Sequence, residues 1–296
     1  MSDGEATRIV LEDGANRAVV APRGAELVHW SVGGRPLTWQ PDPAVWPAVS
    51  PVLFPVVGWA RDGAVRIDGR THPMPVHGFA AGLDFEVAGT DGRAAELRLR
   101  DSAATAAHYP FRFELTVRYR LEGPSLSVAF AVENRDGRAM PYALGIHPGF
   151  RWPLSGDERA GHSIAFELAE EPSVPVIAPG GLFSNERRPV PLDGGRLALS
   201  DAVLAQEALC FLGVRSRGLR YRAPDGSALR IEWDGFPHCA IWSRPPAPFV
   251  SIENWTGHGD PVGFTGELSE KPSMRLLAPG GIGRHAVRYT FEERAG

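Results

Sequence analysis

Three titratable side chains, His77, His147 and Glu253, stand in short segments rich in proline, glycine and aromatic residues. Imidazole and carboxylate groups are the side chains that enzymes use most often to give and take protons. Where their surroundings push their pKa values apart, one such group can accept a proton while another donates one. This combination of residues therefore indicates general acid–base chemistry.

Proline and glycine constrain the backbone around both histidines. Pro75 and Gly78 enclose His77 in a stiff, non-helical segment. Its ring either presents a nitrogen to a pocket or caps a turn by hydrogen bonding. Pro148 biases His147 toward an extended conformation at the end of a short apolar strand. Both histidines are candidates for a site, and a structural role remains the alternative for His77.

Glu253 ends the apolar run of residues 249–252. A carboxylate in that place faces either solvent or a pocket. Burial beside Trp255 would raise its pKa and make it a usable base. Phe150 and Trp152 follow His147 closely. Aromatic rings beside polar groups suit the apolar faces of a sugar, although such rings are also ordinary core residues.

No segment has the spacing of a metal or nucleotide site. His72 and His77 are five positions apart, but Pro73 prevents the helix that would place them on one face. Cys210 and Cys239 lie 29 positions apart, and no glycine-rich phosphate loop is present. We therefore expect no bound metal and no cofactor.

Composition narrows the class of partner. The formal net charge of −4 argues against nucleic acid, which requires a surplus of basic residues on one face. The sequence contains no run of 18 apolar residues, so we expect no membrane span. The first ten residues also lack the pattern of a signal peptide. With only two cysteines, we expect a cytoplasmic protein with free thiols, either a monomer or a homodimer.

Short strands must position these side chains. The 34 glycines and 27 prolines are spread along the whole chain and indicate many turns. Residues 113–121 alternate between apolar and polar side chains. Residues 126–133 form a second strand-like run after a short turn, so the two runs predict a hairpin. The helical signal is weak. We expect one all-β domain over residues 1–296, built as an antiparallel sandwich.

Four motifs recur in order along the chain: PVLFP at 51–55, HGF at 77–79, GIHPGF at 145–150 and IENW at 252–255. Together they resemble the aldose 1-epimerase (galactose mutarotase) family, and they are closest to its LacX-like branch. The resemblance covers nearly the whole chain. It implies a large antiparallel β-sandwich, the galactose mutarotase-like supersandwich, and a small-molecule sugar as the partner.

The resemblance also implies a role for each matched side chain. Glu253 would be the general base and His147 the general acid, and His77 would assist at the ring oxygen of the sugar. Such a site would open the ring, allow rotation about the C1–C2 bond and close the ring on the other face. The implied activity is that of an isomerase that exchanges the α and β anomers of a free hexose or related sugar.

Sugar-binding residues follow less directly from the resemblance. Arg61 best matches the expected arginine, and Asp201, with Asp234 second, best matches the expected aspartate. Two positions depart from the family pattern, because Trp59 and Ala81 stand where many relatives carry arginine. These departures bear on the substrate and leave the three predicted catalytic side chains intact.

Two alternatives stay open at this point. A hexose-6-phosphate 1-epimerase would need a cluster of arginines around the phosphate, and the departures at positions 59 and 81 count against it. A non-catalytic carbohydrate-binding protein of the same fold would have no need of an acid and a base. The presence of Glu253, His147 and His77 counts against that second alternative.

Overall fold

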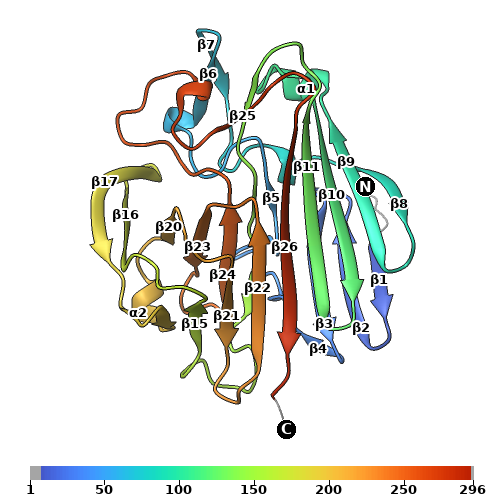
Figure 1. The fold of residues 1–296 in the computed structure, drawn as a ribbon, viewed down its shortest axis with the longest axis vertical. Coiled ribbons are helices and arrows are strands. Elements are labelled where there is room, and N and C mark those ends of the chain that lie inside the picture. Colours follow the sequence, from blue (N-terminus) through green and yellow to red (C-terminus); the bar gives the residue numbers. More distant parts are fainter. Residues whose placement is uncertain (1–7, 295–296) are drawn as a thin grey trace.

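The computed structural model describes residues 8–294 and is built almost entirely of antiparallel strands (Figure 1). The predicted all-β class is thereby confirmed. The helices are short, namely α1 (Ala103–Ala106), α2 (Asp201–Leu204), and the 3-10 turns η1 (Arg61–Gly63), η2 (Ala80–Gly82) and η3 (Leu268–Glu270). None in the described part of the chain has the length and apolar character needed to cross a membrane.

A ten-stranded sheet forms one side of the sandwich (Figure 1). In spatial order its strands are β18 (Leu192–Asp193), β19 (Arg196–Ala198), β15 (Ser163–Phe166), β21 (Gly218–Arg222), β22 (Ala228–Asp234), β26 (Ile282–Glu292), β11 (Ser125–Asn134), β10 (Phe113–Glu122), β9 (Ala94–Arg100) and β8 (Glu86–Thr90).

Two smaller sheets face it. The first contains β1 (Ile9–Asp13), β2 (Asn16–Ala21), β3 (Glu26–Val32) and β4 (Arg35–Pro36). The second, called here the six-stranded sheet, contains β20 (Leu209–Leu212), β23 (His238–Trp242), β24 (Phe249–Trp255), β13 (Gly145–Ile146) and β5 (Val52–Leu53), with β14 (Gly149–Arg151) also paired to β24. Three two-stranded antiparallel sheets complete the fold: β6 (Ala64–Ile67) with β7 (Arg70–Pro73), β12 (Met140–Tyr142) with β25 (Arg275–Leu277), and β16 (Ser173–Ala178) with β17 (Leu182–Pro189).

The hairpin predicted from alternating side chains is confirmed as β10 and β11. Leu121 pairs with Leu126, and the register continues without a bulge to Phe113 opposite Asn134. The turn is made at Gly123, whose φ of 53° suits glycine. Both strands lie in the interior of the ten-stranded sheet, with neighbours on either side, and their apolar faces contribute to the core.

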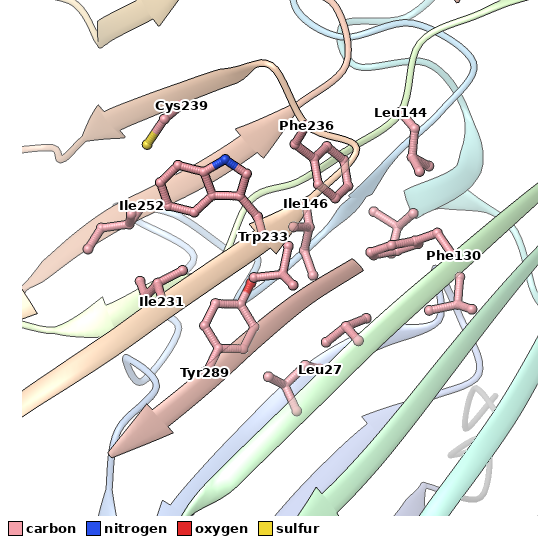
Figure 2. Packing of buried hydrophobic residues seen from close by; sticks show 14 of the residues in the cluster. Leu27, Phe130, Leu144, Ile146, Ile231, Trp233, Phe236, Cys239, Ile252 and Tyr289 are labelled. Carbon is pink, nitrogen blue, oxygen red and sulfur yellow. The ribbon is translucent and has the colours of Figure 1, made fainter. Parts of the chain in front are cut away.

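The core fills the space between the sheets (Figure 2). Leu27 comes from the four-stranded sheet, Ile252 from the six-stranded sheet, and Phe130, Ile231 and Tyr289 from the ten-stranded sheet. All five are exposed by 3% or less. Burial of each of the leucine, isoleucine and phenylalanine side chains among them stabilises the fold by about 1.5–3 kcal/mol. The six-stranded sheet is thus held by one face, and its other face is left for the site.

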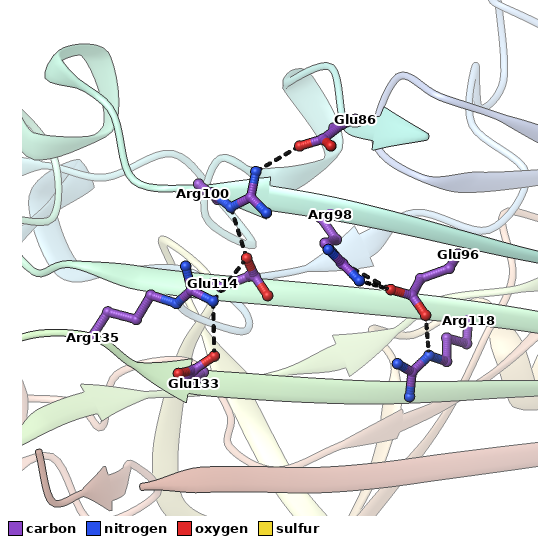
Figure 3. Close-up of polar contacts among 8 residues, drawn as sticks. All are labelled: Glu86, Glu96, Arg98, Arg100, Glu114, Arg118, Glu133 and Arg135. Carbon is purple, nitrogen blue, oxygen red and sulfur yellow. Dashed lines mark hydrogen bonds and ion pairs between the residues drawn. The ribbon is translucent and has the colours of Figure 1, made fainter. Parts of the chain in front are cut away.

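The outer face of the ten-stranded sheet carries an ion-pair ladder (Figure 3). Its members are Glu86, Glu96, Arg98, Arg100, Glu114, Arg118, Glu133 and Arg135. Arg100, for example, lies 2.6 Å from Glu86 and 2.7 Å from Glu114. Exposed pairs of this kind contribute little stability individually. The ladder marks this face of the sheet as the side toward solvent, with opposite charges placed next to one another.

Candidate active site

A cavity of about 510 Å³ lies over the outward face of the six-stranded sheet. Its wall includes all three predicted catalytic side chains, His77, His147 and Glu253. Strand β24 forms its floor, and loops that precede and follow other strands form its sides. The structure thus brings these three residues, which are far apart in the sequence, to one cavity, as predicted.

Alternation along β24 explains how the floor is made. Ser251, Glu253 and Trp255 point to the cavity side, whereas Val250 and Ile252 point into the core between the sheets. Every residue of β24 is nevertheless buried. Successive side chains of a strand point to opposite faces, so one short strand serves both the core and the site.

Two glycines make room for aromatic rings on this floor. A Cβ atom on Gly149 would lie 2.7 Å from Trp46 and 2.8 Å from Trp39, and one on Gly145 would lie 2.9 Å from Trp255. Real Cβ atoms do not approach other atoms so closely. The glycines of the GIHPGF motif therefore let tryptophan rings lie against the backbone on either side of His147.

The His147 imidazole is enclosed by rings and fixed by hydrogen bonds. Its centroid lies 4.9 Å from that of Trp46 and 5.4 Å from that of Trp242. Nδ1 lies 2.9 Å from Oγ of Ser251, which is also 2.9 Å from the carbonyl oxygen of Pro148. Because a carbonyl only accepts, the Ser251 hydroxyl donates to Pro148 and accepts from Nδ1–H of His147.

This arrangement turns Nε2 of His147 toward Glu253. Nε2 lies 3.3 Å from Oε1 of Glu253, and Trp255 Nε1 donates to Oε2 of the same carboxyl at 3.0 Å. Burial raises the pKa of Glu253 well above its usual value, and burial, followed by the nearby His77, holds the pKa of His147 well below its own. Burial therefore favours the state in which the shared proton lies on the carboxyl group.

His77 presents a hydrogen-bond donor to the cavity. The Gly58 N–H donates to its Nδ1 at 3.1 Å, so in the neutral ring the proton lies on Nε2. Burial lowers the pKa of His77 to about 4, which keeps the ring neutral near pH 7. Its backbone has a φ of 63°, uncommon outside glycine. A held, strained backbone of this kind is typical of functional positions.

The structure does not bring the three predicted sugar-binding side chains to this cavity. Arg61 lines a neighbouring hollow of about 360 Å³ and lies 3.4 Å from Asp62. Asp201 begins α2 and pairs there with Arg159. Asp234 ends β22 in the ten-stranded sheet and borders a separate hollow. These positions argue against the predicted sugar contacts, because each side chain is occupied or directed elsewhere.

Other cavity residues were missed by the sequence reasoning. Glu207 and Arg244 lie at the rim, both exposed, and Trp46 forms part of the wall. None of these three belongs to the conspicuous motifs, whereas Trp59, which also lines the cavity, was noted as a departure from the family pattern. Ser251 could have been found, because alternation along an apolar strand places it on the same face as Glu253 two residues later.

A buried ion pair supports one wall of the cavity. Lys271 Nζ lies 2.9 Å from Asp260 Oδ1, and these side chains are exposed by only 1% and 7%. Asp260 also accepts from the Arg61 N–H through Oδ2, and its own N–H donates to the Trp59 carbonyl. Its carbonyl accepts from the Phe183 N–H. This Lys271–Asp260 clamp therefore ties together two segments that reach the cavity.

No group of three or more His, Cys, Asp or Glu side chains between residues 8 and 294 is arranged to hold a metal ion. The site described above consists of a carboxyl group, two imidazoles, aromatic walls and a charged rim. Such a set can transfer protons to and from a small polar molecule with apolar faces.

Comparisons with known proteins agree with one another. The model of the aldose 1-epimerase family matches residues 7–175. Protein LacX of Lactococcus lactis subsp. lactis is 29% identical over 252 residues, which cover 81% of this chain and 84% of LacX. A galactose mutarotase related enzyme from Lactobacillus acidophilus is similar in structure, with a TM-score of 0.91 and 27% identity over 98% of each chain. A galactose mutarotase-like protein from Lactobacillus casei has a TM-score of 0.90 and 27% identity, over 97% of this chain and 100% of that one.

Proposed function

Since this chain belongs to the aldose 1-epimerase family, we propose that it interconverts the α and β anomers of a free hexose or a related sugar. The observation that carries the proposal is the contact between Nε2 of His147 and Oε1 of Glu253 on the cavity floor. A base and an acid that share one proton suit a reaction that removes one proton from the substrate and returns another.

In the proposed reaction the Glu253 carboxylate takes the proton from O1 of the sugar. The C1–O5 bond breaks, and O5 receives a proton from His147, which leaves an open-chain aldehyde. Rotation about the C1–C2 bond then exposes the other face of C1, and the reverse transfers close the ring. Nε2–H of His77 would donate a hydrogen bond to the ring oxygen and stabilise charge that develops there.

The reacting state needs an ionised Glu253 and a protonated His147. Without sugar, burial favours the proton on the carboxyl group. Both states hold the same number of protons, so the exchange needs none from solvent. Sugar hydroxyls that donate to the carboxylate favour its charged form. Substrate binding is thereby expected to move the proton to His147.

The rim supports an uncharged substrate over a sugar phosphate. Among the described residues that line the cavity, Arg244 is the one arginine, and one of its N–H groups already donates to the Val45 carbonyl. Glu207 adds a negative charge to the same cavity. A phosphate group is usually held by several cationic or N–H donors, so this rim suits a phosphate poorly.

The first test is an anomerisation assay. Polarimetry or NMR should show that the protein accelerates equilibration of α-glucose or α-galactose above the spontaneous rate. An equal concentration of glucose 6-phosphate should compete weakly. Sugar binding with no acceleration would refute the enzyme and favour a carbohydrate-binding protein, whereas preferential turnover of the phosphate would favour the hexose-6-phosphate epimerase.

Ser251 is predicted to act by positioning His147. Ser251→Ala leaves Nδ1 of a buried imidazole without its partner, which costs about 1–3 kcal/mol. If that loss falls on the reacting arrangement, kcat should fall by roughly 5- to 150-fold. The pH profile of kcat should also shift, because the tautomer of His147 is no longer fixed. Anomerisation rates between pH 5 and 9 measure both effects.

Ser243→Ala provides the matched control. Ser243 is buried on the segment that follows β23, and its hydroxyl donates to the Phe249 carbonyl at 2.7 Å without touching His147. Its loss should lower stability to a similar extent but leave the pH profile unchanged. Equal effects of the two substitutions on kcat would reduce Ser251 to a structural residue, and recovery by Ser251→Thr would support the positioning role.

A further inference from the structure

Trp59 is unusual among the large apolar side chains, because half of its surface is exposed although it lines the cavity. The other strongly exposed apolar residues between positions 8 and 294 are aliphatic. The indole thus offers an uncovered aromatic surface at the rim. The reacting groups lie much deeper, with Glu253 exposed by 1% and His147 by 8%.

The backbone that carries Trp59 is held on both sides. Gly58 donates its N–H to Nδ1 of His77 at 3.1 Å and accepts from the His77 N–H at 2.9 Å. On the other side, the Asp260 N–H donates to the Trp59 carbonyl at 2.9 Å, and Lys271 fixes Asp260. The indole is therefore presented from a rigid segment that is directly tied to a predicted catalytic residue.

The opposite wall accommodates the ring. Gly181, in the turn between β16 and β17, has a φ of 74°, and a Cβ atom there would lie 1.9 Å from Cδ1 of Trp59. Only glycine permits this contact. Ile177 and Phe183 of the same hairpin also line the cavity. The apolar rim is thus assembled from two segments that fit each other closely.

We propose that Trp59 is a stacking platform for the second ring of an aldose that carries a glycosidic substituent, such as a reducing disaccharide. This inference rests on the proposed function. The reducing ring would lie on the cavity floor, over the contact between His147 and Glu253, and the attached ring would extend to the rim. A cavity of about 510 Å³ falls in the range that holds drug-sized ligands, about 300–1,000 Å³.

The chemistry of the rim fits such a ring. A pyranose has C–H groups on its faces, and these pack on an aromatic surface that presents partial negative charge. Its hydroxyl edge would meet the polar groups of Glu207 and Arg244, which line the same cavity. An arginine at position 59 would instead favour an anionic substituent. The exposed indole therefore selects an uncharged, ring-shaped extension.

The test compares sugars of two sizes on Trp59→Ala and Trp59→Phe. The ratio kcat/KM for anomerisation is measured with glucose and galactose and with maltose and lactose. With Trp59→Ala the loss should be about tenfold greater for the disaccharides than for the hexoses, which corresponds to about 1.4 kcal/mol. The difference should lie in KM, and Trp59→Phe should recover most of it. An equal loss for both sizes would overturn the proposal.

Direct binding separates this inference from the proposed function. Calorimetric titration of maltose into Glu253→Gln and into Glu253→Gln with Trp59→Ala requires no turnover. Weaker disaccharide binding without Trp59 would support the platform even if the wild-type protein anomerised no sugar. Unchanged disaccharide binding would overturn the platform even if hexoses were anomerised. Leu276→Ala, an exposed apolar residue outside the cavity, is the control and should alter neither measurement.

Discussion

Glu253→Gln is expected to slow anomerisation by roughly 10²–10⁴-fold, the contribution of one general acid–base group. Glutamine keeps the shape of the side chain, and its carbonyl oxygen can still accept from Trp255 Nε1, which lies 3.0 Å from the carboxyl group. It cannot take a proton from O1 of a sugar. Because an amide still bonds hydroxyl groups, sugar affinity should change far less than the rate. Polarimetric rates and calorimetric affinities on the same preparation measure the two quantities.

A surface substitution gives the necessary comparison. Glu133→Gln removes a carboxylate from the ion-pair ladder, where Glu133 lies 3.1 Å from Arg135 and is partly exposed. The rate should stay at the wild-type value, and stability should change by less than about 1 kcal/mol. If Glu253→Gln turned over sugar as fast as this control, Glu253 would have no part in the mechanism, and the contact with His147 would be structural.

Lys271→Met is expected to lower the free energy of unfolding by about 3–5 kcal/mol. Methionine has a similar length but no charge, so the Asp260 carboxylate would remain buried without its ammonium partner. The remaining donor in the clamp, the Arg61 N–H, does not neutralise that charge. Urea denaturation followed by tryptophan fluorescence measures the change as a lower midpoint with an unchanged slope.

Two further variants make the interpretation specific. Lys271→Met combined with Asp260→Asn removes both charges and should recover a large part of the loss, because no unpaired charge remains. Arg23→Met breaks an exposed pair, in which Arg23 lies 3.8 Å from Asp84. It should cost at most about 1 kcal/mol. A small effect of Lys271→Met alone would mean that Asp260 is better solvated than its burial implies.

The sequence predicted the features that depend on neighbouring residues in the chain, namely strand alternation and backbone constraints from proline and glycine. Period-2 alternation located the hairpin of β10 and β11, although burial itself alternates only in the second half of β10, because Glu114 and Thr116 on its polar face are also buried. The proline and glycine neighbours of His77 and His147 marked them as positions of fixed backbone. For these two histidines the sequence shows both the imidazole group and the neighbouring proline and glycine residues that restrict the backbone carrying it.

The residues that were missed depend on distant pairing. Trp242 reaches the floor because β23 pairs with β24 in a register that sets it opposite Ser251. Trp46 lies on a loop, and only its packing against His147 and Phe249 identifies it. Asp201 had the expected residue type and a plausible position, but its side chain is bound by Arg159. No sequence pattern records which strand becomes the neighbour of which.

Lys271 is the only lysine among 31 basic residues, and its amine is buried against Asp260. Amine-specific acylating reagents do not modify arginine, so the folded chain offers them no accessible lysine amine between residues 8 and 294. Acylation of Lys271 requires the clamp to open first. The rate at which the peptide containing Lys271 gains the mass of the reagent would then report how often the cavity wall opens.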